Sequence, residues 1–301
     1  MHFNPIFIVL PLLTVLTYSL GLALKLEDFK LLVKKPLSML VGLFAQIFVL
    51  PSVAFAIAFF ANLPEVFFVG LVLIACCPSG SSSNIFTFVV KGDIALALSL
   101  TAIGSVITLF TLPSIMALCV NYTQSLGTGA VLQNKVTLPV GNLLIQNFVT
   151  LVLPVLLGIA TKYFFKNVAL KIERVLSKLA LPSIIILATI YFLKNYSKIA
   201  EHLDKLGLSV LLLVLIAVAV SSLLSRIFRQ SGKTRRTIVI EVAMQNAAQA
   251  IAIASSPFVF NSEIMTIPAI IYALFMNIVL LTYVAIVKRA DKQLEFAKDQ
   301  I

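Results

Sequence analysis

Hydrophobic residues occupy long runs along the chain, and short polar segments separate one run from the next. A run of about 20 apolar residues is long enough to cross the hydrocarbon core of a bilayer as a helix. Nine runs come close to or exceed this length, and they cover residues 5–24, 36–60, 66–90, 94–120, 136–161, 175–193, 207–224, 237–258 and 265–287. We therefore predict an all-α integral membrane protein with about nine transmembrane helices, in which short links make consecutive helices antiparallel neighbours.

The composition agrees with this class. Hydrophobic residues make up 60% of the 301 positions and charged residues 12%, whereas soluble domains carry about 25% charged residues. The mean hydropathy is +1.07, and no polar region is long enough for an appended soluble domain, so residues 1–301 are expected to form one transmembrane unit. The cysteines Cys76, Cys77 and Cys119 lie in apolar runs without metal-ligand spacing, and we expect them to be packing residues.

The net charge of +11 has a topological explanation. The basic residues lie in the links, without the aromatic-rich basic patch of a nucleic-acid-binding protein, so no nucleic-acid partner is expected. Successive links alternate between the two sides of the membrane and so form two sets. Nineteen of the 23 Lys and Arg residues lie on the set that comprises 25–35, 91, 162–178, 226–236 and the tail from 288, and four lie on the other set. Because cytoplasmic loops are enriched in Lys and Arg, this asymmetry predicts a cytoplasmic C-terminus and, with nine spans, an N-terminus outside. The segment 162–178 is expected to be either an amphipathic surface helix or a basic loop.

The third run is interrupted at its centre by the sequence PSGSSSN (78–84). Proline removes a backbone donor and disfavours helix at the preceding residue, and the glycine and serines that follow favour turns. Such a segment at mid-membrane is tolerated only where it is buried in protein or lines a polar cavity. The alternative is a true loop, but residues 66–77 would then be too short to cross the bilayer.

The eighth run carries the polar residues Glu241, Gln245, Asn246 and Gln249. The spacing of Glu241, Gln245 and Gln249 by one helical turn predicts a polar stripe on one helix face. Glu241 is the only acidic residue inside any apolar run as drawn. A carboxylate there costs about 2.5–3.5 kcal/mol on insertion scales, so it should face a cavity and have a partner. The alternative places Glu241 near the cytosolic surface, paired with one of the two arginines that precede it, but the polar residues a turn deeper argue against this.

The two unusual runs occupy corresponding positions in opposite orientation. When the chain is divided into runs one to four and runs five to nine, each unusual run is the next to last of its group. A repeat unit of five helices has an odd number of spans, so its second copy must lie inverted in the membrane. We therefore predict an inverted repeat whose first unit lacks its leading helix. Interrupted runs at corresponding positions indicate a transporter binding site at the repeat interface.

Four segments resemble the bile acid:sodium symporter family, and together they extend over nearly the whole chain. They are GLALKLEDF (21–29), GLFAQIFVLP (42–51), NLPEVFFVGLVLIACCPSGSSSNIFTFVVKGDIALALSLT (62–101) and EVAMQN (241–246). The resemblance implies two crossing discontinuous helices within a core domain that packs against a panel domain. The core would comprise about 36–120 and 207–287, and the panel about 1–35 and 136–206.

The same resemblance implies two sodium ions beside the crossing. The family ligands of the first ion fall on Ser83, Asn84, Thr101 and Glu241. A further family hydroxyl ligand falls on Ala97, which cannot coordinate, so this ion is expected to recruit water, to bind more weakly or to be absent. The family ligands of the second ion fall on the side chains of Gln46, Gln245 and Glu241 and on the backbone carbonyl groups of Val242 and Met244.

The family's substrate contacts fall on Asn246 and Asn277. A histidine of one relative falls on Met276, which puts one polar substrate contact in doubt. General chemistry agrees with these sites, because broken helices present free carbonyl groups to a cation and free N–H groups to an anion. Gln46 alone, amid apolar neighbours, would indicate helix–helix contact rather than ion binding.

We therefore expect a sodium-coupled symporter that imports an organic anion, bile-acid-like or another carboxylate, by alternating access. Its partners would be the anion, sodium and the lipid bilayer of a plasma or bacterial inner membrane, with no obligatory protein partner. The alternative is a proton-coupled organic anion carrier in which Glu241 titrates. A channel is also possible in principle, and saturable counterflow would exclude it. No enzyme is expected, because the sequence has no HExxH motif, no pair of intramembrane aspartates and no Ser/His pairing.

Overall fold

The computed structural model describes residues 6–24, 34–80, 82–125 and 138–298, and nearly all of them are helical. In chain order the helices are α1 (Ile6–Ala23), α4 (Pro36–Phe44), the π-helical η1 (Ala45–Val49), α5 (Leu50–Phe60), α6 (Glu65–Cys76), α7 (Ser83–Val89), α8 (Ile94–Ser125), α9 (Val140–Asn147), the π-helical η3 (Phe148–Val152), α10 (Leu153–Phe164), α11 (Lys166–Ile227), α12 (Gly232–Ala243), α13 (Ala247–Ser255), the 3-10 turn η4 (Ile264–Thr266) and α14 (Ile267–Lys298). Within the described ranges no strand forms beyond one isolated bridge. The all-α prediction is confirmed.

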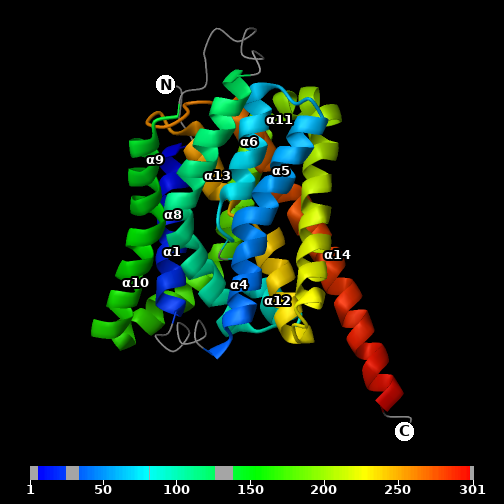
Figure 1. Ribbon diagram of the computed structural model, residues 1–301. Helices are drawn as coiled ribbons and strands as arrows, with labels where there is room; N and C mark the ends of the chain where they lie inside the picture. The colour runs from blue at the N-terminus through cyan, green and yellow to red at the C-terminus, as the bar shows by residue number, and fades with distance from the viewer. Residues whose placement is uncertain (1–5, 25–33, 81, 126–137, 299–301) are drawn as a thin grey trace.

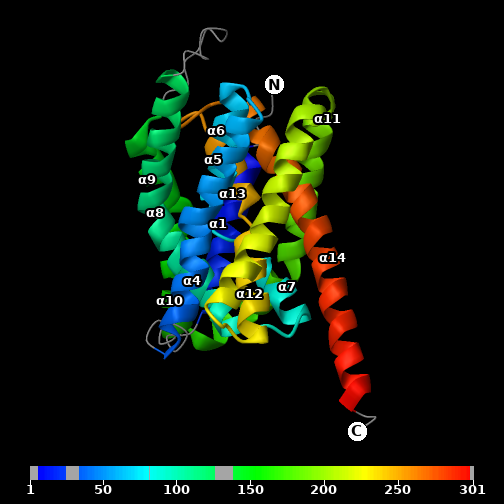
Figure 2. The same cartoon turned by 45° about the vertical axis from the view of Figure 1, so that its right-hand side comes forward.

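Most helices run side by side along the long axis of the molecule, and α14 projects beyond the others at its C-terminal end (Figures 1 and 2). Five described segments are long and apolar enough to cross a membrane, namely Pro36–Phe60, Ile94–Ser125, Val140–Phe164, Leu206–Ile227 and Ile264–Gln293. Val9–Ala23 and Glu65–Cys76 are apolar but shorter. These helices make the chain a multi-pass membrane protein, and the count of nine spans stays a prediction.

Helix α11 differs from the prediction. The sequence indicated two runs, 175–193 and 207–224, separated by a polar link, but one helix of 62 residues covers both of them and the link. A straight helix of this length would be about 93 Å long. Instead, α11 begins and ends at the same end of the molecule and turns back near the opposite end (Figures 1 and 2). The link stays helical because it contains no proline and is rich in residues that favour helix, such as Lys, Glu, Leu and Ala. The segment 166–178 is likewise helix, so the basic-loop alternative is wrong.

Helices α1 and α10 approach each other through glycine. A Cβ atom on Gly21 would lie 2.2 Å from the carbonyl oxygen of Val155, and one on Gly158 would lie 2.5 Å from that of Tyr18. Small residues allow the backbones of membrane helices to come this close. At the end of α1, the Lys162 ammonium donates hydrogen bonds to the last carbonyl groups of the helix, at 2.7–3.2 Å. The two helices therefore form a tightly joined pair.

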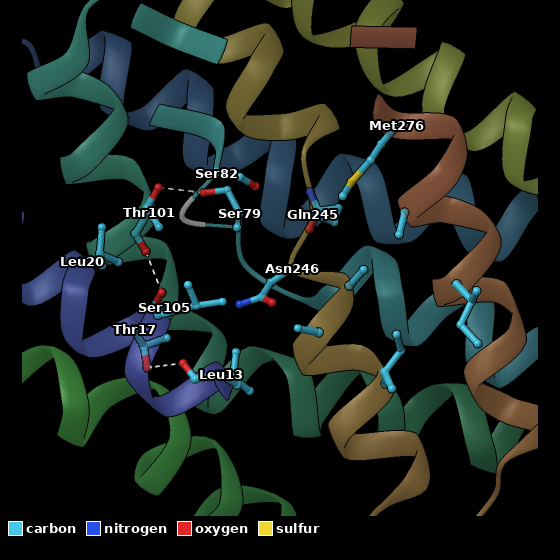
Figure 3. A pocket seen from close by; sticks show the side chains of 17 residues that line it. Leu13, Thr17, Leu20, Ser79, Ser82, Thr101, Ser105, Gln245, Asn246 and Met276 are labelled. Carbon is cyan, nitrogen blue, oxygen red and sulfur yellow. Dashed lines mark hydrogen bonds between the residues drawn. The ribbon is translucent and has the colours of Figure 1, made fainter. Parts of the chain in front are cut away.

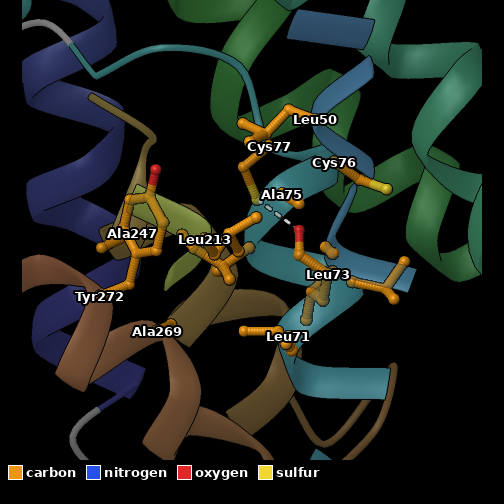
Figure 4. Close-up of a cluster of buried hydrophobic side chains, with 14 of the residues drawn as sticks. Leu50, Leu71, Leu73, Ala75, Cys76, Cys77, Leu213, Ala247, Ala269 and Tyr272 are labelled. Carbon is orange, nitrogen blue, oxygen red and sulfur yellow. Dashed lines mark hydrogen bonds between the residues drawn. The ribbon is translucent and has the colours of Figure 1, made fainter. Parts of the chain in front are cut away.

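The interior between the interrupted helices is apolar and densely filled. Figure 4 shows side chains of α5, α6, α11, α13 and α14 packed together, with Tyr272 and Leu213 among them. Cys76, Cys77 and Cys119 are buried and form no disulfide bond. Their predicted role as packing residues agrees with this burial.

Candidate cation site at the helix crossing

The two interrupted helices meet at their breaks. The Gly80 amide donates to the Met244 carbonyl oxygen at 3.0 Å, and the Asn246 amide donates to the Pro78 carbonyl oxygen at 2.9 Å. Ser79 and Gln245 lie opposite each other in an antiparallel bridge. Two short extended segments, far apart in the sequence, therefore satisfy each other's backbone groups in the interior of the protein, where water is not available to do so.

Local chemistry ends and restarts each helix. After α6, Cys77 is extended (φ −68°, ψ 151°), as expected for a residue that precedes proline. After α12, Met244 leaves the helical region (φ −98°, ψ 82°), and the Tyr272 hydroxyl donates to the Ala243 carbonyl oxygen at 2.8 Å. The Asn246 side chain then caps α13 by accepting a hydrogen bond from the Gln249 amide. Tertiary partners thus replace the helical hydrogen bonds that the breaks remove.

Glu241 lies one turn before the second break and is completely buried. Its Oε2 atom accepts hydrogen bonds from Ser79 Oγ at 2.5 Å and from Thr101 Oγ1 at 2.7 Å. The carboxylate forms no ion pair within the part of the chain that the structure describes. The nearby Arg236 instead binds Asp291, with Nη1 at 2.9 Å from Oδ2. The surface alternative for Glu241 is therefore wrong, because the carboxylate is inside the protein and its neutral partners leave its charge uncompensated.

Several oxygen atoms around this carboxylate have no hydrogen-bond partner. They are Glu241 Oε1, Gln245 Oε1, Ser83 Oγ and Gln46 Oε1, all buried. An unsatisfied buried polar atom costs about 1–3 kcal/mol, so a native structure rarely keeps several together without a ligand. Buried atoms without partners also occur in Thr87, Asn147, Ser225 and Gln249. In the described contacts, none of these four residues lies next to an acidic side chain.

Gln46 reaches the crossing from an irregular stretch of helix. It lies in the π-helical segment η1, which contacts both α8 and α12. Its Oε1 atom lies 3.6 Å from the position that a Cβ atom on Gly104 of α8 would take. Gly104 lies one turn beyond Thr101, so the amide is on the face of α8 that meets Glu241. Short π-helical segments occur frequently at functional sites.

The unpartnered oxygen atoms and the carboxylate fit a hard cation. Carboxylate, amide and hydroxyl oxygens are the ligands such ions prefer, and the negative charge offsets the cost of moving the ion out of water. No group of three or more His, Cys, Asp or Glu side chains that could hold a softer metal occurs in the described ranges. The arrangement therefore favours an alkali cation held by one carboxylate and several neutral oxygens.

A cavity with both polar and apolar lining residues lies beside the crossing, between the breaks and helices α1, α8, α13 and α14. We call it the crossing cavity. Residues on its wall include Leu13, Thr17, Leu20, Ser79, Ser82, Thr101, Ser105, Gln245, Asn246 and Met276 (Figure 3). The N-terminal residues of α13 also reach this wall, so the cavity is next to the positive end of that helix.

Comparison with known proteins identifies the family. The profile of the sodium bile acid symporter family matches residues 10–202 of the chain. The chain belongs to the sodium bile acid symporter family. It is therefore a membrane transporter of a sodium symporter family and not an enzyme.

Relatives of this symporter occur in bacteria, plants and animals. It is 29% identical over 272 residues to the uncharacterized sodium-dependent transporter YocS of Bacillus subtilis, covering 88% of this chain and 78% of YocS. It is 28% identical over 284 residues to the probable sodium/metabolite cotransporter BASS1, chloroplastic, of Arabidopsis thaliana, covering 94% of this chain and 67% of BASS1. With the human sodium-dependent organic anion transporter it shares 34% identity over 149 residues, which is 49% of this chain and 37% of that protein.

The structure brings most of the predicted ion ligands of this symporter to one place. Glu241 and Thr101 are in direct contact, and Ser83 and Asn84 begin α7 immediately after the first break. Gln245 lies in the second break, where its Nε2 atom donates to the Val242 carbonyl oxygen at 2.7 Å. The Val242 and Met244 carbonyl oxygens each already accept one hydrogen bond, which leaves each with one further lone pair.

Other predicted features are not brought together. Gln249 does not continue a stripe with Glu241 and Gln245, because the helix is broken between them, and its Nε2 atom donates to Asn147 Oδ1 at 3.2 Å. That part of the prediction is wrong. Asn277, the second predicted substrate contact, is absent from the wall of the crossing cavity that Asn246 lines.

Sequence reasoning missed two polar residues of the site. Ser79 is the closest hydrogen-bond partner of Glu241, and Ser105 lies on the cavity wall one turn beyond Thr101. The signal for Ser79 was its place inside the helix-breaking segment 78–84. Ala97 is fully buried, and its carbonyl oxygen accepts from Thr101 Oγ1 at 3.1 Å, so no side-chain oxygen is present at the position of the missing family ligand.

Proposed function

We propose that this protein is a sodium-coupled symporter that imports an organic anion by alternating access. The observation that carries the proposal is the buried Glu241 carboxylate at the meeting point of two helix breaks, surrounded by oxygen atoms without partners. A cation supplies the positive charge that this arrangement lacks and a partner for its unpaired acceptor oxygens. Membership of a sodium symporter family makes sodium the cation we propose.

Two ions would share the Glu241 carboxylate. The first would use Ser83, Asn84 and Thr101, and the second would use Gln46, Gln245 and the carbonyl groups of Val242 and Met244. Ser83 has a buried unpartnered oxygen at the first proposed site, and Gln46 and Gln245 have such oxygens at the second. Each ion would add contacts between residues on the two sides of the crossing, and so would organise it.

The anion would bind in the crossing cavity, beside the cations. Asn246 caps α13 and lines this cavity, so a carboxylate there would meet an amide and the positive end of a helix. With two sodium ions, a monovalent anion would move with one net positive charge. A membrane potential, negative inside, favours this inward movement by about 2.3 kcal/mol per 100 mV.

The moving parts would be a core and a panel. The core, about 36–120 and 207–287, contains both breaks, and the panel, about 1–35 and 136–206, contains the tightly joined α1 and α10. We propose nine spans in an inverted repeat, with the N-terminus outside and the C-terminus in the cytoplasm of a plasma or bacterial inner membrane. The excess of Lys and Arg on alternate links supports this orientation.

Uptake into proteoliposomes tests this function. A panel of labelled bile-acid-like steroids and small carboxylates is presented with either sodium or potassium outside. We expect at least one anion to accumulate only with sodium, and accumulation to increase when the interior is made negative. Equal uptake in both salts would contradict sodium coupling.

The second candidate is a proton-coupled carrier in which Glu241 titrates. The absence of a side-chain ligand at Ala97 favours it, because one predicted sodium site is incomplete. Uptake driven by an inward pH gradient in sodium-free buffer would support this candidate over the first.

Restoring the missing oxygen should strengthen sodium binding. Ala97 lies one turn before Thr101 on α8, so the hydroxyl of Ala97→Ser would point toward the same site. We expect the sodium concentration for half-maximal uptake to fall by about tenfold, the effect of one added favourable contact of about 1.4 kcal/mol. Ala97→Val, which adds volume without oxygen, is the matched control and should weaken sodium dependence; a lower sodium requirement in both variants would contradict a ligand role.

A further inference from the structure

Two cavities beside the crossing share part of their lining, which we call the shared wall. The second lies along α14 and is bordered by α7 and α11; we call it the α14 cavity. The crossing cavity and the α14 cavity share the lining residues Ser82, Ala273 and Met276. Ser82 and Ala273 are small, so Met276 has the only long side chain among the described residues of the shared wall. Asn246 lies on one side of this wall and Asn277 on the other.

The Met276 side chain lines both cavities and lies at their boundary. It is 4% exposed although it borders both of them. In Figure 3 it extends from α14 toward the two helix breaks. A second thioether lies beside the wall, because Ser82 Oγ contacts Met244 Sδ at 3.7 Å. Methionine is unbranched and has three rotatable side-chain bonds, so it can fill such a gap and also move out of it.

The cavities differ in the chemistry of their walls. The crossing cavity presents hydroxyl and amide groups from the breaks and from α8, including Ser79, Ser105 and Asn246. The α14 cavity is mainly aliphatic and aromatic, with Phe86, Phe192 and Leu281 among its residues. A polar anionic group therefore suits the first cavity, and a hydrocarbon tail suits the second.

We propose that Met276 determines the substrate size of this transporter, by separating a polar head-group cavity from an apolar tail cavity. In the closed arrangement, the crossing cavity accepts compact organic anions, and a long amphipathic anion is excluded because its tail meets the thioether. Shortening the side chain would join the cavities and extend the range to anions with longer tails. This inference rests on the proposed function, because it assigns the crossing cavity to an anion.

Straight-chain carboxylates of two to ten carbons test the proposal. The readout is the carboxylate concentration that gives half-maximal thermal stabilisation of the purified protein. Only stabilisation that occurs in sodium and not in potassium is counted. For the unmodified protein we expect affinity to stop improving at a short chain length. For Met276→Ala we expect the improvement to continue beyond that length, by about fourfold for each further methylene that enters the apolar cavity. Met276→Leu conserves the volume and should keep the original limit.

Leu274→Ala is the matched control, because Leu274 lines the α14 cavity without reaching the wall. It should leave the chain-length limit unchanged. Met276→Cys removes only part of the side chain and should give a smaller shift, so the test does not depend on the folding of the alanine variant. The same limit in every Met276 variant, or an equal shift in Leu274→Ala, would overturn the proposal.

Absence of stabilisation by any carboxylate in sodium would also overturn the proposal. In that case, stabilisation by sodium alone, lost in Glu241→Gln, would leave the proposed sodium coupling intact. The failure of the size filter and the failure of the proposed function are therefore distinguishable.

Discussion

Replacement of Glu241 by glutamine is expected to reduce sodium-driven uptake by more than about 100-fold. The carboxylate is fully buried, and it is the only charged group that the structure places at the crossing among the described residues. Removing one partner of a buried charge pair costs about 3–5 kcal/mol, and about 1.4 kcal/mol corresponds to tenfold in affinity. Initial rates of uptake into proteoliposomes, over a range of sodium concentrations, measure this loss.

Glutamine keeps the size of the side chain, so the variant should still fold. Its melting temperature in sodium-free detergent should stay near that of the unmodified protein, whereas any stabilisation by added sodium should disappear. Glu65→Gln is the matched control, because Glu65 is also buried in an interrupted helix, with 4% exposure, but lies about 16 Å along α6 from the break. Sodium-dependent uptake should survive in the control. Sodium-dependent uptake that survives in Glu241→Gln would show that Glu241 is not part of the ion site.

Gly21→Val is expected to destabilise the folded protein by about 3 kcal/mol or more, at the upper end of the usual cost of overpacking. A Cβ atom there would meet the Val155 backbone at 2.2 Å, and a backbone carbonyl cannot rotate away as a side chain can. Helices α1 and α10 would have to separate, which also breaks the contacts of Lys162 with the end of α1. Thermal unfolding followed by size-exclusion chromatography in detergent measures the effect.

Gly141→Ala is the control for this substitution. No atom lies within 4 Å of the position of its added Cβ, and alanine favours helix over glycine by about 1 kcal/mol. Its melting temperature should therefore be equal to or slightly above that of the unmodified protein. A Gly21→Val variant as stable as this control would show that α1 and α10 do not pack as closely as described.

The sequence alone predicted the first helix break, because neighbouring residues in the chain cause it. Pro78 and the glycine and serines that follow it are a local helix-breaking signal. Residues 77–80 and 82 are not helical, and residue 81 lies outside the described residues. The second break has no proline or glycine between Met244 and Asn246. It depends on tertiary hydrogen bonds from Gly80 and Tyr272, which a periodicity argument cannot include. For this reason the polar residues 241, 245 and 249 were wrongly placed on one face.

Other features of the site also required the three-dimensional structure. The π-helical segment around Gln46 has no distinctive sequence, since AQIFV reads as ordinary apolar helix. The role of Ser79 beside Glu241 depends on the register of the two breaks, which one residue of slippage would change. The separation of Asn246 and Asn277 into two cavities likewise depends on the packing of α14, whereas their amide chemistry alone suggested one binding site.

Direct binding of radioactive sodium to the purified protein tests the central claim that the helix crossing holds sodium. Unlabelled sodium, but not potassium, should displace the label, and saturation should approach two ions per chain. The same preparation of Glu241→Gln should bind no sodium above background. Saturable binding of equal strength in the unmodified protein and in Glu241→Gln, or no saturable binding in either, would contradict a cation site at the crossing.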